Sequence, residues 1–434
     1  MRELVLVLRG ARVIDPSRGL DETADVVVEG TRIGRIGRDA AMGIAPSEAV
    51  RVVDARGCWI APGFVDLHAH LREPGDEEEE DVASGLAAAA AGGFTTVCTM
   101  PNTRPVIDDA HRVRSLRERA AAVGGPRLRP MAAVTQGSEG RALTDARALR
   151  EAGAVGLSDD GRCVADAALM REALRQAREH DLLISQHCED PSMTRGAPIH
   201  DGEVSRRLGV RGWPREAEDV IVARDLVLAE ATGARYHVAH VSSLGAVRLL
   251  REAKARGLRV SAEVTPHHLL LTDEAVLLYG AQCKVNPPLR SEADRAALRE
   301  ALADGTLDCI ATDHAPHRPS EKACPLEQAA FGITGLETAL AVLLDLVRDG
   351  TLTPMRLLEA LSTAPARILG DADAGTLREG ARADLVVIDP ARTWTVTPER
   401  LRGKSHNGPW LGRTLTGRVV MTIVEGRIVH EVPA

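Results

Sequence analysis

Short apolar runs rich in β-branched residues alternate with segments of helical periodicity through the middle of the chain. Eight apolar runs are strand candidates, at residues 59–71, 95–100, 128–135, 154–160, 182–188, 236–242, 259–265 and 309–313. Between them, apolar residues recur every three or four positions, for example at 166–179, 216–231 and 246–256. This alternation predicts an α/β fold, a (β/α)8 barrel of the TIM type, with its chemistry at the carboxyl ends of the strands.

Both ends of the chain show a different pattern, in which short strands are joined by tight turns. Strands are predicted at 4–8, 11–14, 25–28, 32–36, 383–389, 419–424 and 427–429. A Glu-Gly pair marks a turn near each end, at Glu29-Gly30 and at Glu425-Gly426. We therefore expect one small β-sandwich made from both ends, residues 1–60 and 366–434, and a catalytic barrel over 61–365.

Composition and charge exclude several classes of protein. The 434 residues exceed what one core usually holds, which agrees with one large and one small domain. The net charge of −8 argues against a nucleic-acid partner. No segment approaches ~20 continuous apolar residues, and the start lacks a signal-peptide layout, so no membrane association is expected. Seven scattered cysteines without a Cys-x-x-Cys pair exclude a zinc ribbon and favour the cytoplasm.

Six potential metal ligands stand at the ends of strand candidates. They are His68, His70, Asp160, His187, His240 and Asp313. His68 and His70 are two positions apart, so their side chains point to the same side of a strand and can bind one ion. Because the strand ends of a barrel meet at one face, the six residues can form a centre for two divalent ions.

The ligands divide into two groups according to their strands. His68 and His70 from strand 1 are expected to hold the first ion with Asp313 from strand 8, whereas His187 and His240 hold the second. Two neighbouring cations also need an anionic bridge.

An aspartate is the expected bridge. Many enzymes of this architecture use a carboxylated lysine, but the lysines of this chain, at 254, 284, 322 and 404, all follow the fifth strand. Asp159 and Asp160 end strand 4 and offer carboxylates instead. Since neighbouring strand residues face opposite ways, only one can point inward. Asp160 is the prediction and Asp159 the alternative.

The chain resembles the bacterial type I dihydroorotases of the amidohydrolase superfamily. The resemblance rests on nine segments in order along the barrel: DLHAHLREPG at 66–75, AGGFTTV at 91–97, MPNT at 100–103, SDDG at 158–161, QHCE at 186–189, HVAHVS at 237–242, VNPPLR at 285–290, TDHAPH at 312–317 and FGITGLET at 331–338. The segments HLREPG and MPNT distinguish this family from other members of the superfamily. The His-x-His pair and the strand 8 aspartate are shared more widely.

The resemblance implies a reaction and a cofactor. The reaction is the reversible interconversion of N-carbamoyl-L-aspartate and (S)-dihydroorotate in pyrimidine synthesis. Two divalent ions, with zinc as the expected metal, would activate a bridging hydroxide for attack on the ring amide carbonyl. Asp313 would act as the general acid and base.

Substrate recognition is expected from residues close behind the strand ends. The guanidinium of Arg72, two positions after His70, matches a carboxylate bidentately. The resemblance implies that Arg72, Asn102 and His317 hold the substrate carboxylate, that Asn286 contacts the ring, and that Phe331 and Gly332 contact it through the backbone. The full set expected at the substrate is His70, Arg72, Asn102, Asn286, His317, Phe331 and Gly332.

Some polar residues have less specific interpretations. Residues 317–330 are expected to form a mobile lid, in which Lys322 is a second candidate for a substrate role. His237, three positions before His240, is expected to face the opposite side of its strand. His267 and His268 end strand 7, and we expect a structural role for them. The acidic run 76–81 is interpreted as the solvated start of a helix.

Two other functions compete with the dihydroorotase interpretation. A hydantoinase or dihydropyrimidinase would share the fold and metals, but that group typically has the carboxylated lysine. A dihydroorotase-like scaffold subunit of aspartate carbamoyltransferase would be expected to lack metal ligands, and all six are present here. The expected partners are a small-molecule substrate and, in a homodimer, a second copy of the chain. The sequence leaves open whether activity needs a complex with aspartate carbamoyltransferase.

Overall fold

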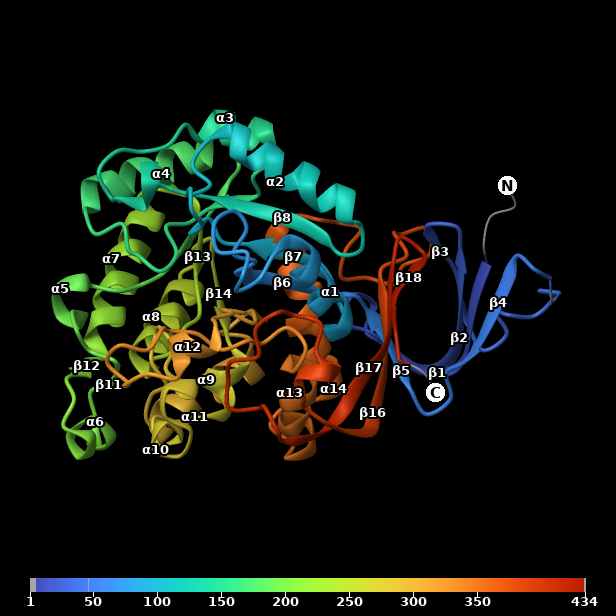
Figure 1. The fold of residues 1–434 in the computed structure, drawn as a ribbon. Helices are drawn as coiled ribbons and strands as arrows, with labels where there is room; N and C mark the ends of the chain where they lie inside the picture. Colours follow the sequence, from blue (N-terminus) through green and yellow to red (C-terminus); the bar gives the residue numbers. More distant parts are fainter. Residues whose placement is uncertain (1–4, 46, 433–434) are drawn as a thin grey trace.

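A sheet built from both ends of the chain lies beside a barrel in the computed structural model, which describes residues 5–45 and 47–432 (Figure 1). The strands of this sheet are β1 Val5–Asp15, β2 Leu20–Glu29, β3 Arg32–Gly37, β4 Val50–Asp54, β5 Trp59–Pro62, β16 Leu385–Thr395, β17 Thr414–Val424 and β18 Arg427–Glu431. β5 pairs with β1 on one side and with β16 on the other. It therefore joins the two halves, and the prediction of one β structure from both ends is confirmed.

Details of this sheet differ from the sequence pattern. The segments 4–8 and 11–14 belong to the single strand β1, which has a register shift between Leu8 and Ala11; Leu4 lies outside the described residues. β4 was not predicted; it is short, and none of its side chains is fully buried. The turn between β17 and β18 has positive φ at Glu425 and Gly426, as in a two-residue hairpin.

Eight parallel strands form the barrel, in the order in which they occur along the chain. They are β6 Phe64–Ala69, β7 Phe94–Thr99, β8 Arg127–Ala132, β9 Gly156–Leu157, β10 Leu183–Gln186, β13 Arg235–Val238, β14 Val260–Val264 and β15 Cys309–Ile310. A parallel bridge between Ala69 and His314 connects the last strand region to the first. All eight predicted strands are present, and the predicted barrel is confirmed.

The predicted first strand, 59–71, is divided between the two sheets. Its first part is β5 of the terminal sheet, and its second part is β6 of the barrel. At Gly63, the backbone N–H donates to Asp384 O at 3.0 Å, whereas the next N–H, of Phe64, donates to Gly93 O at 2.9 Å. The chain therefore changes its hydrogen-bonding partner at Gly63, which an unbroken apolar run does not reveal.

Helices surround the barrel strands (Figure 1). The longer ones are α1 Val82–Gly92, α2 Ala110–Val123, α3 Ala146–Ala152, α4 Ala167–Glu179, α7 Glu216–Thr232, α8 Leu244–Ala255, α11 Glu292–Asp304 and α13 Ala339–Arg348. Shorter elements are α5 Pro191–Thr194, α6 Glu203–Leu208, α9 Pro266–Leu270, α10 Ala275–Tyr279, α12 Pro319–Lys322, α14 Pro354–Leu358, α15 Ala364–Leu369 and the strands β11 Ile199–His200 and β12 Gly212–Trp213. In the described part of the chain, no helix combines the length and apolarity needed to cross a membrane.

The barrel and the terminal sheet pack closely against each other. α1 and α13 both contact β17. Gly417 of β17 has no room for a side chain, because a Cβ atom there would lie 2.2 Å from Leu344 Cδ1 of α13. This close approach fixes the terminal sheet against the outside of the barrel.

Candidate functional site

The carboxyl ends of the barrel strands bring the six predicted ligands together. His68 Nε2, on β6, lies 3.2 Å from Asp160 Oδ1 and 3.6 Å from Asp313 Oδ1. His70 Nε2 lies 3.2 Å from Asp313 Oδ1 and 3.5 Å from Asp160 Oδ2. The two imidazoles thus face the same two carboxylates, as their spacing on a strand allows.

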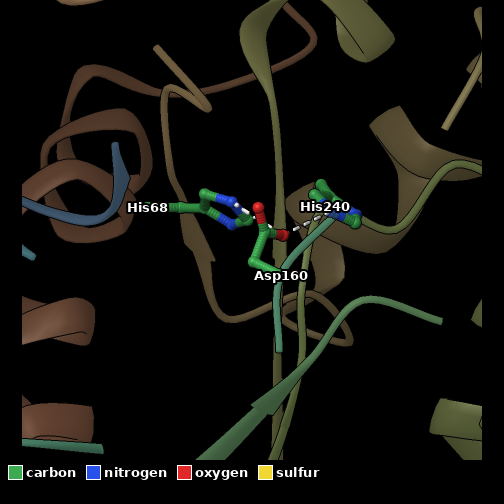
Figure 2. Close-up of side chains that lie close together, drawn as sticks. All are labelled: His68, Asp160 and His240. Atoms are coloured by element: carbon green, nitrogen blue, oxygen red, sulfur yellow. Dashed lines mark ion pairs between the residues drawn. The ribbon is translucent and has the colours of Figure 1, made fainter. Parts of the chain in front are cut away.

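Asp160 lies between histidines from three different strand ends. Its Oδ1 is 3.5 Å from His240 Nε2 and 3.7 Å from His187 Nδ1. Figure 2 shows the Asp160 carboxylate between the rings of His68 and His240. Burial by itself would raise the pKa of Asp160, but the neighbouring His68, His240 and His70 hold it well below its usual range. The carboxylate is therefore an anion surrounded by nitrogen atoms.

His187 and His240 form the other side of the group. His187 Nδ1 lies 2.9 Å from His240 Nε2, and His187 Nε2 lies 2.8 Å from Glu189 Oε2. Glu189 also accepts a hydrogen bond from Asn286 Nδ2 at 3.2 Å. Glu189 was not among the predicted site residues, although it follows His187 by two positions.

The donor set fits a divalent metal centre. His68 Nε2 and Asp160 Oδ1 are buried and have no hydrogen-bond partner among the described residues. Among the groups of buried side chains whose potential ligand atoms lie within 4.8 Å of one another, two include His68: one adds Asp160 and His240, the other His70 and Asp313. Imidazole and carboxylate ligands together suit ions such as Zn²⁺, Mn²⁺ and Co²⁺.

Glu263 of β14 contacts His68 and His237 and was not predicted from the sequence. Its Oε1 is 2.8 Å from His68 Nδ1, and its Oε2 is 3.0 Å from His237 Nε2. A carboxylate on the second ring nitrogen fixes the orientation of a metal-binding histidine. The available signal was an acidic residue between the apolar residues Ala262 and Val264.

The expectation for His237 was wrong. Its side chain is buried beside Glu263 and does not point away from the site side of the strand. Strand alternation predicts opposite faces for His237 and His240. However, β13 ends at Val238, and His240 has a φ of 30°, so the alternation does not continue to His240.

Of three further residues at the strand ends, Asp159 and His268 have local hydrogen-bond partners. Asp159 points away from the histidines, because its Oδ1 accepts a hydrogen bond from the Thr135 N–H at 3.0 Å. His268 Nε2 lies 3.0 Å from Pro287 O. The neighbouring His267 is also buried, but its Nε2 has no hydrogen-bond partner in the described chain.

Arg72 and His317 come together at the edge of the group. Arg72 Nη2 lies 3.1 Å from His317 Nε2, and Arg72 Nε donates to Pro316 O at 3.0 Å. Arg72 has a φ of 57°, so the chain has turned from the extended direction expected after His70. The resulting cationic group lies next to a potential metal centre.

Asn102 connects this edge to the ligand group. Its Oδ1 lies 2.9 Å from His70 Nδ1, and its Nδ2 donates to Asp160 Oδ2 at 3.2 Å. The amide therefore orients one potential ligand and contacts another. Asn286 lies on the opposite side, where its buried Oδ1 has no hydrogen-bond partner among the described residues.

The acidic run 76–81 is only partly a solvated helix start. Asp81 caps α1, as expected, by accepting from the Ser84 N–H at 2.7 Å. Glu79 and Glu80 are buried instead, with exposed fractions of 6% and 0%. Glu79 Oε2 lies 3.2 Å from Arg72 Nε, so this carboxylate balances the partly buried guanidinium.

Comparisons with known proteins agree with this geometry. The family model described as "Dihydro-orotase-like" matches residues 57–245. A protein of Anaeromyxobacter dehalogenans named dihydroorotase is 54% identical over 98% of each chain. One of Syntrophus aciditrophicus with the same name is 49% identical over 98% of this chain and 99% of its own.

Solved structures of related enzymes share the architecture. An L-hydantoinase (dihydropyrimidinase) from Arthrobacter aurescens superposes with a TM-score of 0.86 at 25% identity, over 98% of this chain and 96% of its own. A D-hydantoinase (dihydropyrimidinase) from Thermus sp. gives a TM-score of 0.82 at 26% identity, over 98% and 95%. These matches confirm the fold of the cyclic amidohydrolases. The near-complete relatives at about half identity go further: the chain belongs to the dihydroorotase family.

Proposed function

We propose that this protein is an active dihydroorotase, which interconverts N-carbamoyl-L-aspartate and (S)-dihydroorotate in pyrimidine synthesis. The observation that supports this best is the position of the Arg72 guanidinium, in contact with His317 beside the His–Asp group, because its fork of N–H donors matches a substrate carboxylate. The names of the near-full-length relatives agree with it.

The lysine positions argue against the hydantoinase alternative. Lys254 pairs with Asp308 Oδ2 at 2.6 Å, and Lys404 pairs with Asp81 Oδ2 at 2.6 Å. Lys284 and Lys322 donate to main-chain carbonyls of the loop after strand 8, at Leu326 and Ala330 respectively. All four lysines are thus engaged away from the histidines, whereas Asp160 has the place between them.

We propose that two divalent ions, most suitably zinc, bind here. His68, His70 and Asp313 would hold one ion, His187 and His240 the other, and Asp160 would contact both. When bound, such ions lower the pKa of coordinated water and polarise a carbonyl group. Elemental analysis should find close to two divalent ions per chain; a fully active preparation with one would contradict the pairing.

The residues around the centre have distinct proposed tasks. Arg72, Asn102 and His317 hold the substrate carboxylate, Asn286 contacts the ring, and Phe331 and Gly332 present backbone groups to it. Asp313 accepts the proton of the attacking water and returns it to the ring nitrogen when the C–N bond breaks. In the biosynthetic direction, the same proton transfers run in reverse.

The proposal is tested by an assay with a matched variant. Metal-loaded wild-type protein should interconvert both compounds, and Asp313→Asn should reduce turnover by about two orders of magnitude or more, as expected for a positioned general base. Metal content must be measured on both proteins. Near-normal turnover of a metal-replete Asp313→Asn protein would assign the base elsewhere.

We also propose a cytoplasmic homodimer. The seven cysteines are all free, as expected in a reducing compartment. Val220 and Val227, seven positions apart on α7, leave 45% and 63% of their surface exposed, and a second copy could cover them. Light scattering will give the mass of the protein alone and after mixing with aspartate carbamoyltransferase, the other partner considered.

A further inference from the structure

The loop after strand 8, residues 317–332, surrounds a buried lysine. Lys322 ends α12 and is 3% exposed. Its Nζ donates to three main-chain oxygens: Lys284 O at 3.1 Å, Ala330 O at 2.9 Å and Gly332 O at 2.9 Å. An ammonium group has three donors, so these bonds use all of them.

Lys284, on the loop after strand 7, binds the same loop from the other side. Its Nζ donates to Leu326 O at 2.7 Å and to Glu327 O at 3.1 Å. Its carbonyl accepts from the Gly332 N–H at 2.9 Å as well as from Lys322. The two lysine side chains therefore connect the loops after strands 7 and 8 by hydrogen bonds to main-chain oxygens.

The two connected loops contain residues that we propose to contact the substrate. Gly332 and Phe331 are next to each other in one loop, and Asn286 follows Lys284 by two positions in the other. The Lys284 ammonium lies 4.2 Å from the centre of the Phe331 ring. The Lys322 ammonium contacts carbonyl oxygens, none of which belongs to the six potential metal ligands.

We propose that Lys322 is a positioning residue, which holds the loops after strands 7 and 8 at a fixed distance so that Asn286 and the Phe331–Gly332 backbone are arranged before substrate binds. This inference rests on the proposed function. It also argues against a freely mobile lid at residues 317–330, because Lys322 at the end of α12 binds Lys284 O on the loop after strand 7.

The cost of burying this cation supports a specific role. A buried ammonium is unfavourable unless hydrogen bonds replace its water. Burial and the charge of Lys284 lower the pKa of Lys322 to about 7, while the thiols of Cys283 and Cys324 act in the opposite direction. A lysine that served only to keep the loop soluble would have its ammonium group exposed to solvent.

The test compares Lys322→Met with wild type and with Lys254→Met. Methionine keeps much of the volume but loses all three donors, and Lys254 is a matched control whose ammonium binds Asp308 on the outside of the barrel. We expect KM for dihydroorotate to rise about tenfold or more, with kcat changing less, and amide exchange at 323–332 to accelerate. The control should retain wild-type KM and exchange in this loop.

Two outcomes would overturn the inference. One is wild-type KM and kcat in Lys322→Met; the other is a fall in kcat with KM unchanged, which would place the residue in the chemical step. If Lys322→Met does not fold, Lys322→Gln, which keeps two donors, should show an intermediate rise in KM. If the wild type does not turn over dihydroorotate, the proposed function fails. The role of Lys322 in holding the loop is then tested by amide exchange at 323–332 in the variant and the wild type.

Discussion

Asp159 and Asp160 are adjacent in the chain, yet their carboxylates lie in different surroundings. Asp160 Oδ1 is 3.2 Å from His68 Nε2, whereas Asp159 binds the Thr135 N–H. We expect Asp160→Ala to lose bound metal and Asp159→Ala to retain it, because only the first removes a potential ligand. Elemental analysis after dialysis against a weak chelator measures this difference. The opposite order would identify Asp159 as the bridge.

Arg72 provides a second prediction at the residue scale. Lysine keeps the charge but cannot form the planar, bidentate contact with a carboxylate. We expect Arg72→Lys to lose about 2 to 4 kcal/mol of transition-state binding, or roughly 30- to 1000-fold in kcat/KM for dihydroorotate. Steady-state kinetics at equal metal content measure the loss. A variant with unchanged kcat/KM would show that another group binds the carboxylate.

Many residues of the site could be predicted from the sequence, but not all of the residues that orient them. The six potential ligands were predictable because each follows an apolar run, and a barrel brings strand ends together. Glu263 was not, because its partners His68 and His237 are distant in the sequence. His237 was misassigned because positive φ at His240 interrupts the alternation, and φ cannot be read from residue types.

At the scale of elements, Gly63 separates β5 of the terminal sheet from β6 of the barrel. A Cβ atom there would lie 2.3 Å from Thr95 Cγ2 on β7. We expect Gly63→Ala to lower the midpoint of thermal unfolding, because overpacking of this kind costs about 1 to 3 kcal/mol.

Gly305→Ala is a suitable comparison for that measurement. Gly305 has a φ of +85° but no atom within 4 Å of an added Cβ, so only the backbone cost applies. Scanning calorimetry on both variants separates crowding from backbone strain. An unchanged midpoint for Gly63→Ala would mean that β6 and β7 move apart easily.

Strand lengths show where periodicity stops being informative. The apolar runs 154–160 and 309–313 predicted whole strands, but β9 and β15 have two residues each. Ser158 and Ala311 still donate backbone hydrogen bonds to the neighbouring strands, at Ala132 O and Val264 O, and Asp160 and Asp313 follow two residues later. Apolar character reports burial, and a buried loop at the end of a barrel strand satisfies the same pattern as a strand.

For the whole molecule, the two chain ends meet in one sheet that packs against the barrel (Figure 1). Repeated strand and turn patterns at both ends made this arrangement predictable. The domain boundaries at residues 60 and 365 remain predictions. Near the first of them, β5 of the terminal sheet and β6 of the barrel are separated only by Gly63. The hydantoinase-like fold also means that architecture alone does not distinguish the substrates of this superfamily.

The central claim is that the site recognises a carboxylate on a cyclic amide. The most direct measurement is kcat/KM for dihydroorotate and for dihydrouracil, which lacks the carboxylate, in one metal-loaded preparation. The proposed contacts with Arg72, Asn102 and His317 predict a large preference for dihydroorotate, which shrinks in Arg72→Lys. Equal turnover of dihydrouracil and dihydroorotate by the wild-type protein would contradict the dihydroorotase assignment.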